Sequence, residues 1–222
     1  MTLPERWARV AAIDDSVELP AWLAPVAEGV RGVHVDDITR FAPKHGEGRA
    51  AAVLLLFGDG PDLLLVQRAQ ELRAHAGQAA FPGGATELHD AGPRDAALRE
   101  AHEETGLDVA GVRIFGQLPD LSLPVTGYVV TPVLGWWHTP SAVYPADPRE
   151  VVSVHRVGIA ELADPANRCR IQHPSGYVGP AFLVQNMVVW GFTAGIIAGI
   201  LDRAGWAEPW DASRILPLEA GA

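Results

Sequence analysis

Residues 81–107 read FPGGATELHDAGPRDAALREAHEETGL and contain the clearest local structural signals of the chain. Pro93 suits the first turn of a helix because its missing N–H would be unpaired there, and Gly106 suits the position where a helix ends. The turn before this helix contains Gly83 and Gly84, whose missing side chains let backbone groups approach a metal ion or a phosphate. The pattern therefore predicts a Gly-rich turn followed by a helix.

Three carboxylates share one face of that helix. Glu103 and Glu104 follow Glu100 by three and four residues, which are the spacings at which helical side chains become neighbours. Like charges at this distance raise each other's pKa, and a hard divalent cation such as Mg²⁺ relieves the repulsion. A solvated acidic surface is the alternative interpretation. An arginine, three glutamates and a glycine at these spacings are expected by chance only about 10⁻⁴ times in such a chain, which favours a metal site.

This stretch resembles the Nudix box, G-x5-E-x7-R-E-U-x-E-E-x-G-U, in which U is aliphatic. The second half, REAHEETGL at residues 99–107, matches at every fixed position. The first half differs, because the loop between Gly84 and Arg99 is one residue longer than in the box. The usual first acid therefore falls on either Glu87 or Asp90, and the choice stays open. The resemblance implies an α/β/α sandwich with a mixed β-sheet in a single domain.

A second resemblance lies immediately upstream. Residues 64–84, LLVQRAQELRAHAGQAAFPGG, are similar to the signature of the coenzyme A pyrophosphatases within the Nudix group, L-L-T-x-R-[SA]-x3-R-x3-G-x3-F-P-G-G. Val66 replaces the threonine of that signature. The resemblance implies a hydrolase that cleaves the pyrophosphate bond of coenzyme A or its thioesters. The products would be 4′-phosphopantetheine species and adenosine 3′,5′-bisphosphate.

The resemblance also implies roles for single residues. Glu100, Glu103 and Glu104 correspond to the metal-binding glutamates of the family, with Mg²⁺ or Mn²⁺ as the ion, and the Gly84 carbonyl region adds an oxygen ligand. Glu100 and Glu103 are also expected to take part in catalysis. Glu150, in a later Pro-rich loop, is the candidate for a general base or an extra ligand, against the alternative of a surface residue at a strand end. Which glutamate accepts the proton stays open.

Two arginines and a histidine in the upstream signature are candidates for substrate binding. Arginine recognises phosphate through two parallel hydrogen bonds, and coenzyme A carries a 3′-phosphate besides its pyrophosphate. One of Arg68 and Arg73 is therefore expected to contact substrate, with ion pairs as the alternative. His75 is expected to contact substrate or to cap a loop. Arg99 is expected to support the site by pairing with Glu103, four residues further on.

The composition limits the class of protein. The chain of 222 residues suits one domain, divided into an N-terminal extension (1–47), a Nudix hydrolase domain (48–203) and a C-terminal tail (204–222). The net charge of −10 argues against a nucleic-acid-binding surface, which needs a basic field. A single cysteine excludes an internal disulfide, so we expect a cytoplasmic protein.

One apolar run, residues 187–201, could be mistaken for a membrane span. Fifteen residues make a helix of about 22 Å, which is short of the roughly 30 Å of a bilayer core. The run is therefore predicted to be a buried helix. Gly191, Gly195 and Gly199 recur at every fourth position and predict close packing against the sheet or against a second copy of the chain, so a homodimer stays open.

Several other segments predict strands. Residues 50–57 form a continuous apolar run, and residues 62–68 follow after a Gly-rich turn, which indicates a pair of buried strands. Residues 128–137 also predict a strand, but Pro132 interrupts it and predicts an edge strand or a bulge. Strands alternating with helices are typical of an α/β protein.

Two other functions stay open. The first is a Nudix hydrolase of another nucleoside diphosphate derivative, such as ADP-ribose or NADH. The second is a nucleotide-sensing module that keeps the fold without turnover. Loss of the acids would be the mark of such a module, and all three glutamates are present.

Overall fold

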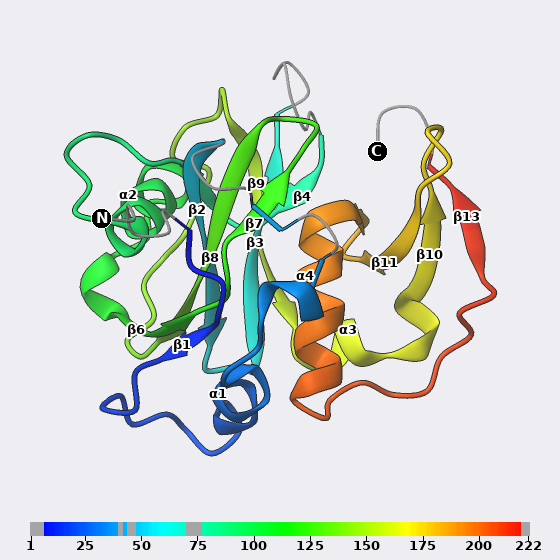
Figure 1. Ribbon diagram of the computed structural model, residues 1–222, viewed down its shortest axis with the longest axis horizontal. Helices are drawn as coiled ribbons and strands as arrows, with labels where there is room; N and C mark the ends of the chain where they lie inside the picture. The colour runs from blue at the N-terminus through cyan, green and yellow to red at the C-terminus, as the bar shows by residue number, and fades with distance from the viewer. Residues whose placement is uncertain (1–6, 40–41, 44–47, 70–76, 219–222) are drawn as a thin grey trace, which may run out of the picture.

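A mixed β-sheet forms the centre of the molecule, with helices on both of its faces (Figure 1). The computed structural model describes residues 7–39, 42–43, 48–69 and 77–218. The strands are β1 (Ala12–Ile13), β2 (Arg49–Gly58), β3 (Asp62–Arg68), β4 (Ala79–Ala80), β5 (Gly83–Ala85), β6 (Val112–Gln117), β7 (Leu121–Leu123), β8 (Tyr128–Trp137), β9 (Val151–Gly158), β10 (Arg168–Gln172), β11 (Val178–Val184), β12 (Met187–Val189) and β13 (Ile215–Pro217). The α-helices are α1 (Ala24–Val30), α2 (Pro93–Thr105), α3 (Ile159–Ala163) and α4 (Gly191–Arg203).

The large sheet has the order β1-β6-β8-β2-β3-β4, with β5 beside β2, β7 beside β8 and β9 beside β3. β2 and β8 run parallel along most of their length, and the other pairings are antiparallel. Both faces of β2 are buried, which is why its sequence is continuously apolar rather than alternating. The predicted strands at residues 50–57 and 62–68 are confirmed as β2 and β3.

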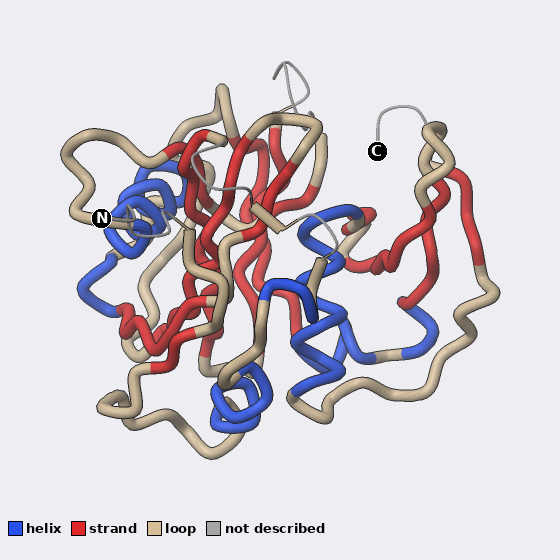
Figure 2. Tube along the Cα trace, in the orientation of Figure 1, coloured by secondary structure: helices blue, strands red, loops and turns tan. Residues whose placement is uncertain are grey.

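The two faces of the sheet have separate cores. Leu54 and Leu56 of β2 pack on one face, in the cluster that contains the alanines of α2. Leu55 and Phe57 point to the opposite face, where they join a larger cluster with residues of α1 and α4. Figure 2 shows α2 and α4 on the two sides of the strands. The predicted α/β/α sandwich with a mixed sheet in a single domain is thus confirmed.

A second, four-stranded sheet of order β12-β11-β10-β13 lies on the far side of α4 from the large sheet (Figure 1). The predicted N-terminal extension contributes α1 and the short strand β1 to the body of the molecule, and the tail contributes β13, which pairs with β10. The predicted boundaries at residues 47/48 and 203/204 stay predictions. Within the described residues, no helix is long and apolar enough to cross a membrane.

The prediction that Pro132 makes its strand an edge or a bulge is wrong. β8 is an inner strand, with β2 on one side and β6 and β7 on the other. β6 pairs with β8 from Val133 onward, and β7 pairs with it up to Val130. Pro132 lies in the gap between these pairings, where no neighbouring strand needs its missing N–H, and its carbonyl accepts a hydrogen bond from Leu118 N–H (2.9 Å).

The prediction of one helix over residues 187–201 is also partly wrong. Met187–Val189 is β12, joined to β11 by a tight turn in which Gln185 and Asn186 have positive φ, and α4 begins only at Gly191. The glycines do not pack closely on the sheet. A Cβ built on Gly191 or Gly195 would meet no atom within 4 Å, and the isoleucines fill the core instead.

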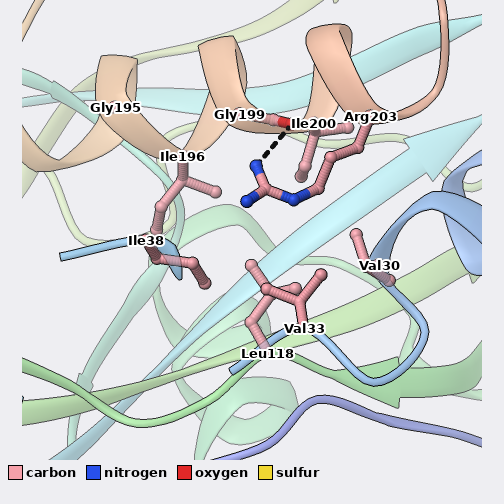
Figure 3. A pocket seen from close by; sticks show the side chains of 9 residues that line it. All are labelled: Val30, Val33, Ile38, Leu118, Gly195, Ile196, Gly199, Ile200 and Arg203. Carbon is pink, nitrogen blue, oxygen red and sulfur yellow. Dashed lines mark hydrogen bonds between the residues drawn. The ribbon is translucent and has the colours of Figure 1, made fainter. Parts of the chain in front are cut away.

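Gly195 and Gly199 line a small apolar crevice of about 20 Å³ between α4 and the N-terminal segment (Figure 3). Val30, Val33 and Ile38 face them across it, and Arg203 closes one end by donating to the Gly199 carbonyl (3.2 Å). Gly191 and Gly195 thus border open space, whereas Arg203 covers Gly199. The association of two copies through the glycine row stays a prediction.

Candidate active site

The acids stand on α2, whose ends are those that the sequence predicts. Pro93 is its first residue, and Gly106 ends it in the left-handed region with φ of +67°. The helix buries Ala96, Ala97 and Ala101 against the sheet. These small side chains let the helix lie close to the strands, so that Glu100 and Glu104 reach the glycine turn.

The glycine turn lies against Glu100 and Glu104. β5 pairs with β2, with Gly84 opposite Ala52 and Gly83 opposite Val53. A Cβ on Gly83 would lie 2.3 Å from the Ala52 carbonyl oxygen, and a Cβ on Gly84 would lie 2.6 Å from the carboxylate of Glu100. Both positions therefore require glycine, the second because the carboxylate of Glu100 occupies the space of a side chain.

Arg99 holds the exposed side of the site together. Its Nη1 donates to Glu100 (2.9 Å) and to Glu103 (3.0 Å), which confirms the predicted pair with Glu103. Its Nε and Nη2 donate to the two oxygens of Asp90 (both 3.0 Å), and Nη2 also donates to the Ala85 carbonyl (3.0 Å). One planar guanidinium thus ties the loop to two of the three helical acids.

These contacts distinguish the two candidates for the first acid of the box. The Asp90 carboxylate is 2% exposed, and its hydrogen bonds from Arg99 lower its pKa. The Glu87 carboxylate is 57% exposed and lies 4.0 Å from Arg99. Asp90 is therefore the structural partner of Arg99 in this longer loop.

Glu104 is the buried acid of the site, with 2% of its side chain exposed. One oxygen accepts a hydrogen bond from Arg68 Nη1 (3.2 Å), and the other accepts one from the Gly83 N–H (3.0 Å). Burial raises its pKa to about 7, although Arg68 and Gly83 oppose the rise and Glu100 adds to it. Arg68 is thus paired with an acid of the box, the alternative that the sequence left open.

Glu100 lies between the other acids. Burial raises its pKa, the hydrogen bond from Arg99 opposes this, and the charges of Glu103 and Glu150 add to the rise. Glu150 also raises the pKa of Glu104. The exposed Glu150 therefore adds to the negative charge that raises the pKa of both helical acids.

Backbone hydrogen bonds hold the loop that carries Glu150. The N–H groups of Tyr144 and Ala146 donate to the carbonyls of Thr105 and Glu104 (2.9 and 3.0 Å), which are free at the end of α2. The Glu150 carbonyl accepts from Ala69 N–H (2.8 Å), directly after β3. No sequence pattern predicted this attachment, because it depends on where α2 and β3 meet in space.

Two predicted site residues, Arg73 and His75, lie outside the described residues, so their roles stay predictions. Within the described part of the chain, no three His, Cys, Asp or Glu side chains converge as they stand to hold a metal ion. Glu104 is turned to Arg68 and Gly83, and Glu103 to Arg99. The donor set nevertheless fits a hard divalent cation, since it consists of carboxylate oxygens, which such a cation prefers.

Comparison with known proteins identifies the family. The NUDIX domain family matches residues 46–172, which is more than half of the chain. The chain belongs to the Nudix hydrolase family. Similar proteins include the "Uncharacterized Nudix hydrolase NudL" of Enterobacter sp. (strain 638), 43% identical over 166 residues, and that of Escherichia coli (strain K12), 42% identical over 166 residues. Each alignment covers 71% of this chain and 83% of the relative.

Among solved structures, a Nudix hydrolase from M. smegmatis, RenU, is 25% identical, and the match covers 51% of this chain and 72% of that chain with a TM-score of 0.40. Nudix hydrolases act on nucleoside diphosphate derivatives and generally need divalent metal ions. This Nudix hydrolase is accordingly a pyrophosphohydrolase, an enzyme that acts on phosphoric anhydrides.

Proposed function

We propose that this Nudix hydrolase cleaves the pyrophosphate bond of coenzyme A or its thioesters. The products are then 4′-phosphopantetheine species and adenosine 3′,5′-bisphosphate. The observation that carries the substrate is the signature at residues 64–84, which matches that of the coenzyme A pyrophosphatases except at Val66. Two residues of this signature contact the box helix: Arg68 and Gly83 both donate to Glu104, which supports a joint role of the two motifs.

Glu100, Glu103 and Glu104 are the proposed ligands of the metal ion, and the Gly84 carbonyl is a further oxygen ligand. Glu100 and Glu103 converge on one nitrogen of Arg99, and the charges of Glu100 and Glu104 interact. When bound, a divalent ion supplies neutralisation of the phosphate oxygens and activation of water. The protein's own contribution is to fix the acids, through Asp90 and Arg99 on one side and Gly83 on the other.

Glu150 is the proposed general base or additional ligand. Its loop is attached to the end of α2 and to the residue after β3 by backbone hydrogen bonds. The charge of its carboxylate contributes to the raised pKa of Glu100 and of Glu104. Arg68, Arg73 and His75 are the proposed substrate contacts. A 3′-phosphate is the feature that distinguishes coenzyme A from dephospho-coenzyme A, and an arginine is suited to bind it.

The test is product analysis by mass spectrometry. The full chain is incubated with coenzyme A, dephospho-coenzyme A, ADP-ribose and NADH, each with Mg²⁺, with Mn²⁺ and with a chelator. Metal-dependent formation of adenosine 3′,5′-bisphosphate, with faster turnover of coenzyme A than of the other three, supports the proposal.

Faster cleavage of ADP-ribose or NADH would contradict the proposed substrate and favour a different nucleoside diphosphate derivative. Binding of these compounds without any product would contradict the proposed reaction. The variant Glu150→Gln separates the roles proposed for that residue. As a base, Glu150 contributes mainly to kcat and its pH profile, whereas as a ligand it contributes to the metal concentration required for half-maximal activity.

A further inference from the structure

Arg68 has an unusual position for a substrate-binding residue. It is the last residue of β3, where the register with β9 shifts, and its backbone is fixed by hydrogen bonds with Gln78 (3.0 Å) and Gly77 (3.1 Å). Its side chain, 21% exposed, reaches the buried Glu104 on the helix opposite. A strand end with paired backbone groups thus holds a positive charge against the buried acid Glu104.

In this pair Glu104 has a hydrogen-bond partner for each of its oxygens, whereas Arg68 has a buried donor without a partner. Both oxygens of Glu104 are occupied, one by Arg68 Nη1 and one by the Gly83 N–H. Arg68, by contrast, uses Nη1 for Glu104, while its Nε is buried and has no hydrogen-bond partner. A buried donor without a partner is costly, and this one lies on a guanidinium suited to bind a phosphate oxygen.

We infer that Arg68 competes with the metal ion for Glu104 and thereby couples metal binding to substrate binding. If Glu104 were a ligand of a divalent cation, Arg68 would leave this carboxylate, because two positive charges on neighbouring oxygens of one carboxylate would repel each other. The guanidinium, still held by the end of β3, then donates to a phosphate oxygen of the substrate. This inference rests on the proposed function of Glu104 as a metal ligand.

Arg99 does not share this property. Its Nε, Nη1 and Nη2 all have acceptors, among them the nearly buried Asp90, so it remains in place when Glu100 or Glu103 turns to an ion. Arg68 has Glu104 as its single acid within the described residues. The two arginines therefore differ in function: Arg99 positions the acids, and Arg68 exchanges one anionic partner for another.

The test is Mn²⁺ binding to the full chain without substrate, measured by isothermal titration calorimetry. In Arg68→Gln, a neutral amide replaces the competing charge and can still donate to Glu104. We expect this variant to bind Mn²⁺ about five- to tenfold more tightly than the wild type, within the usual range of coupling between two ligands. The KM for coenzyme A should rise about tenfold or more, because a charged hydrogen bond to phosphate is lost.

Arg156→Gln is the matched control. It removes one positive charge from another arginine, which pairs with the buried Asp62 at the opposite end of β3 (2.6 Å), and Mn²⁺ affinity should not change. Arg68→Lys keeps the charge and should bind Mn²⁺ like the wild type, while its KM rises because one point charge replaces the planar fork. This variant also covers the case that Arg68→Gln does not fold.

A merely structural role for Arg68 predicts the opposite sign. If Arg68→Gln binds Mn²⁺ as weakly as the wild type or more weakly, or if Arg68→Lys has an unchanged KM, the inference is wrong. Glu104→Gln identifies the other failure. If it binds Mn²⁺ as tightly as the wild type, Glu104 is not a metal ligand. The proposed metal site and the inference about Arg68 are then both wrong.

Discussion

The helices α2 and α4 are both thirteen residues long and lie on opposite faces of the same sheet, but they bury different kinds of residue. α2 buries three alanines, a threonine and an acid: Ala96, Ala97, Ala101, Glu104 and Thr105. α4 buries mainly large aliphatic side chains: Thr193, Ala194, Ile196, Ile197, Ile200 and Leu201. Since hydrophobic stabilisation scales with apolar area, α4 supports the fold, whereas α2 supports the chemistry.

The largest effect is expected on α2. Glu103→Gln removes a charge that is 56% exposed and keeps the shape of the side chain, so the free energy of unfolding should change little. Loss of a metal ligand should raise the activation barrier by several kcal/mol and lower turnover about 10³-fold. Steady-state kinetics with saturating Mg²⁺ and urea unfolding measure the two quantities.

Glu87→Gln is the matched control, because Glu87 is equally exposed at 57% and belongs to the same box. Its turnover should stay within a few-fold of the wild type. Equal losses in the two variants would show that the acidic surface matters as a whole and that Glu103 has no special place in it.

A substitution in the core side of α4 is expected to lower stability and to leave turnover unchanged. Ile197 is 2% exposed in the core between α4 and the sheet, and Ile197→Ala should lower the free energy of unfolding by about 3 kcal/mol through lost burial and a residual cavity. Turnover at low temperature should be unchanged. Ile215→Ala, at a position 46% exposed, should cost less than about 0.5 kcal/mol. A catalytic defect in folded Ile197→Ala would contradict the division of roles.

A smaller effect is expected from the acid that α2 buries. The pKa of Glu104 is raised from 4.5 to about 7 in the folded protein, so the folded state binds its proton more tightly than the unfolded chain. The stability from this proton is fully present below about pH 4.5 and is lost as pH rises through about 7. With metal removed by a chelator, the free energy of unfolding should fall by up to about 1.4 kcal/mol per pH unit in this window.

Urea unfolding between pH 4.5 and 7.5 measures this slope. Glu104→Gln has no proton to lose at that position and should reduce the slope, and Mg²⁺ should reduce it as well, because the ion binds the ionised carboxylate. Identical slopes in the wild type and in Glu104→Gln would show that the burial of this acid does not control the pH dependence.

The smallest effect is expected at Gly195 of α4. Gly195 is exposed within the helix, and no atom lies within 4 Å of the position of its Cβ, so Gly195→Ala should stabilise the protein by about 0.5–1 kcal/mol. Gly29→Ala is the contrasting control, since its Cβ would lie 2.4 Å from the Arg203 carbonyl oxygen and should destabilise. Urea unfolding measures the stability of Gly195→Ala, and light scattering measures its oligomeric state. A loss of stability or the dissociation of a dimer would instead indicate that a second copy packs against this helix.

Elements whose signals are local could be predicted from the sequence alone. Capping, periodicity and turn residues that lie close together along the chain predict helix α2, which begins at Pro93 and ends before Gly106. The same kinds of signal predict the glycine turn and the strands β2 and β3. The spacing of Glu100, Glu103 and Glu104 likewise needs only helical geometry. The sandwich fold followed from the resemblance that these residues carry.

The contacts between groups from distant parts of the chain depend on the three-dimensional fold. It paired Arg68 with Glu104, chose Asp90 over Glu87 as the partner of Arg99, and placed the Glu150 loop against the end of α2. It also placed Pro132 inside the sheet, in a gap left by two other strands. Such contacts join residues far apart in sequence, and no local pattern contains the burial that selects one partner among several.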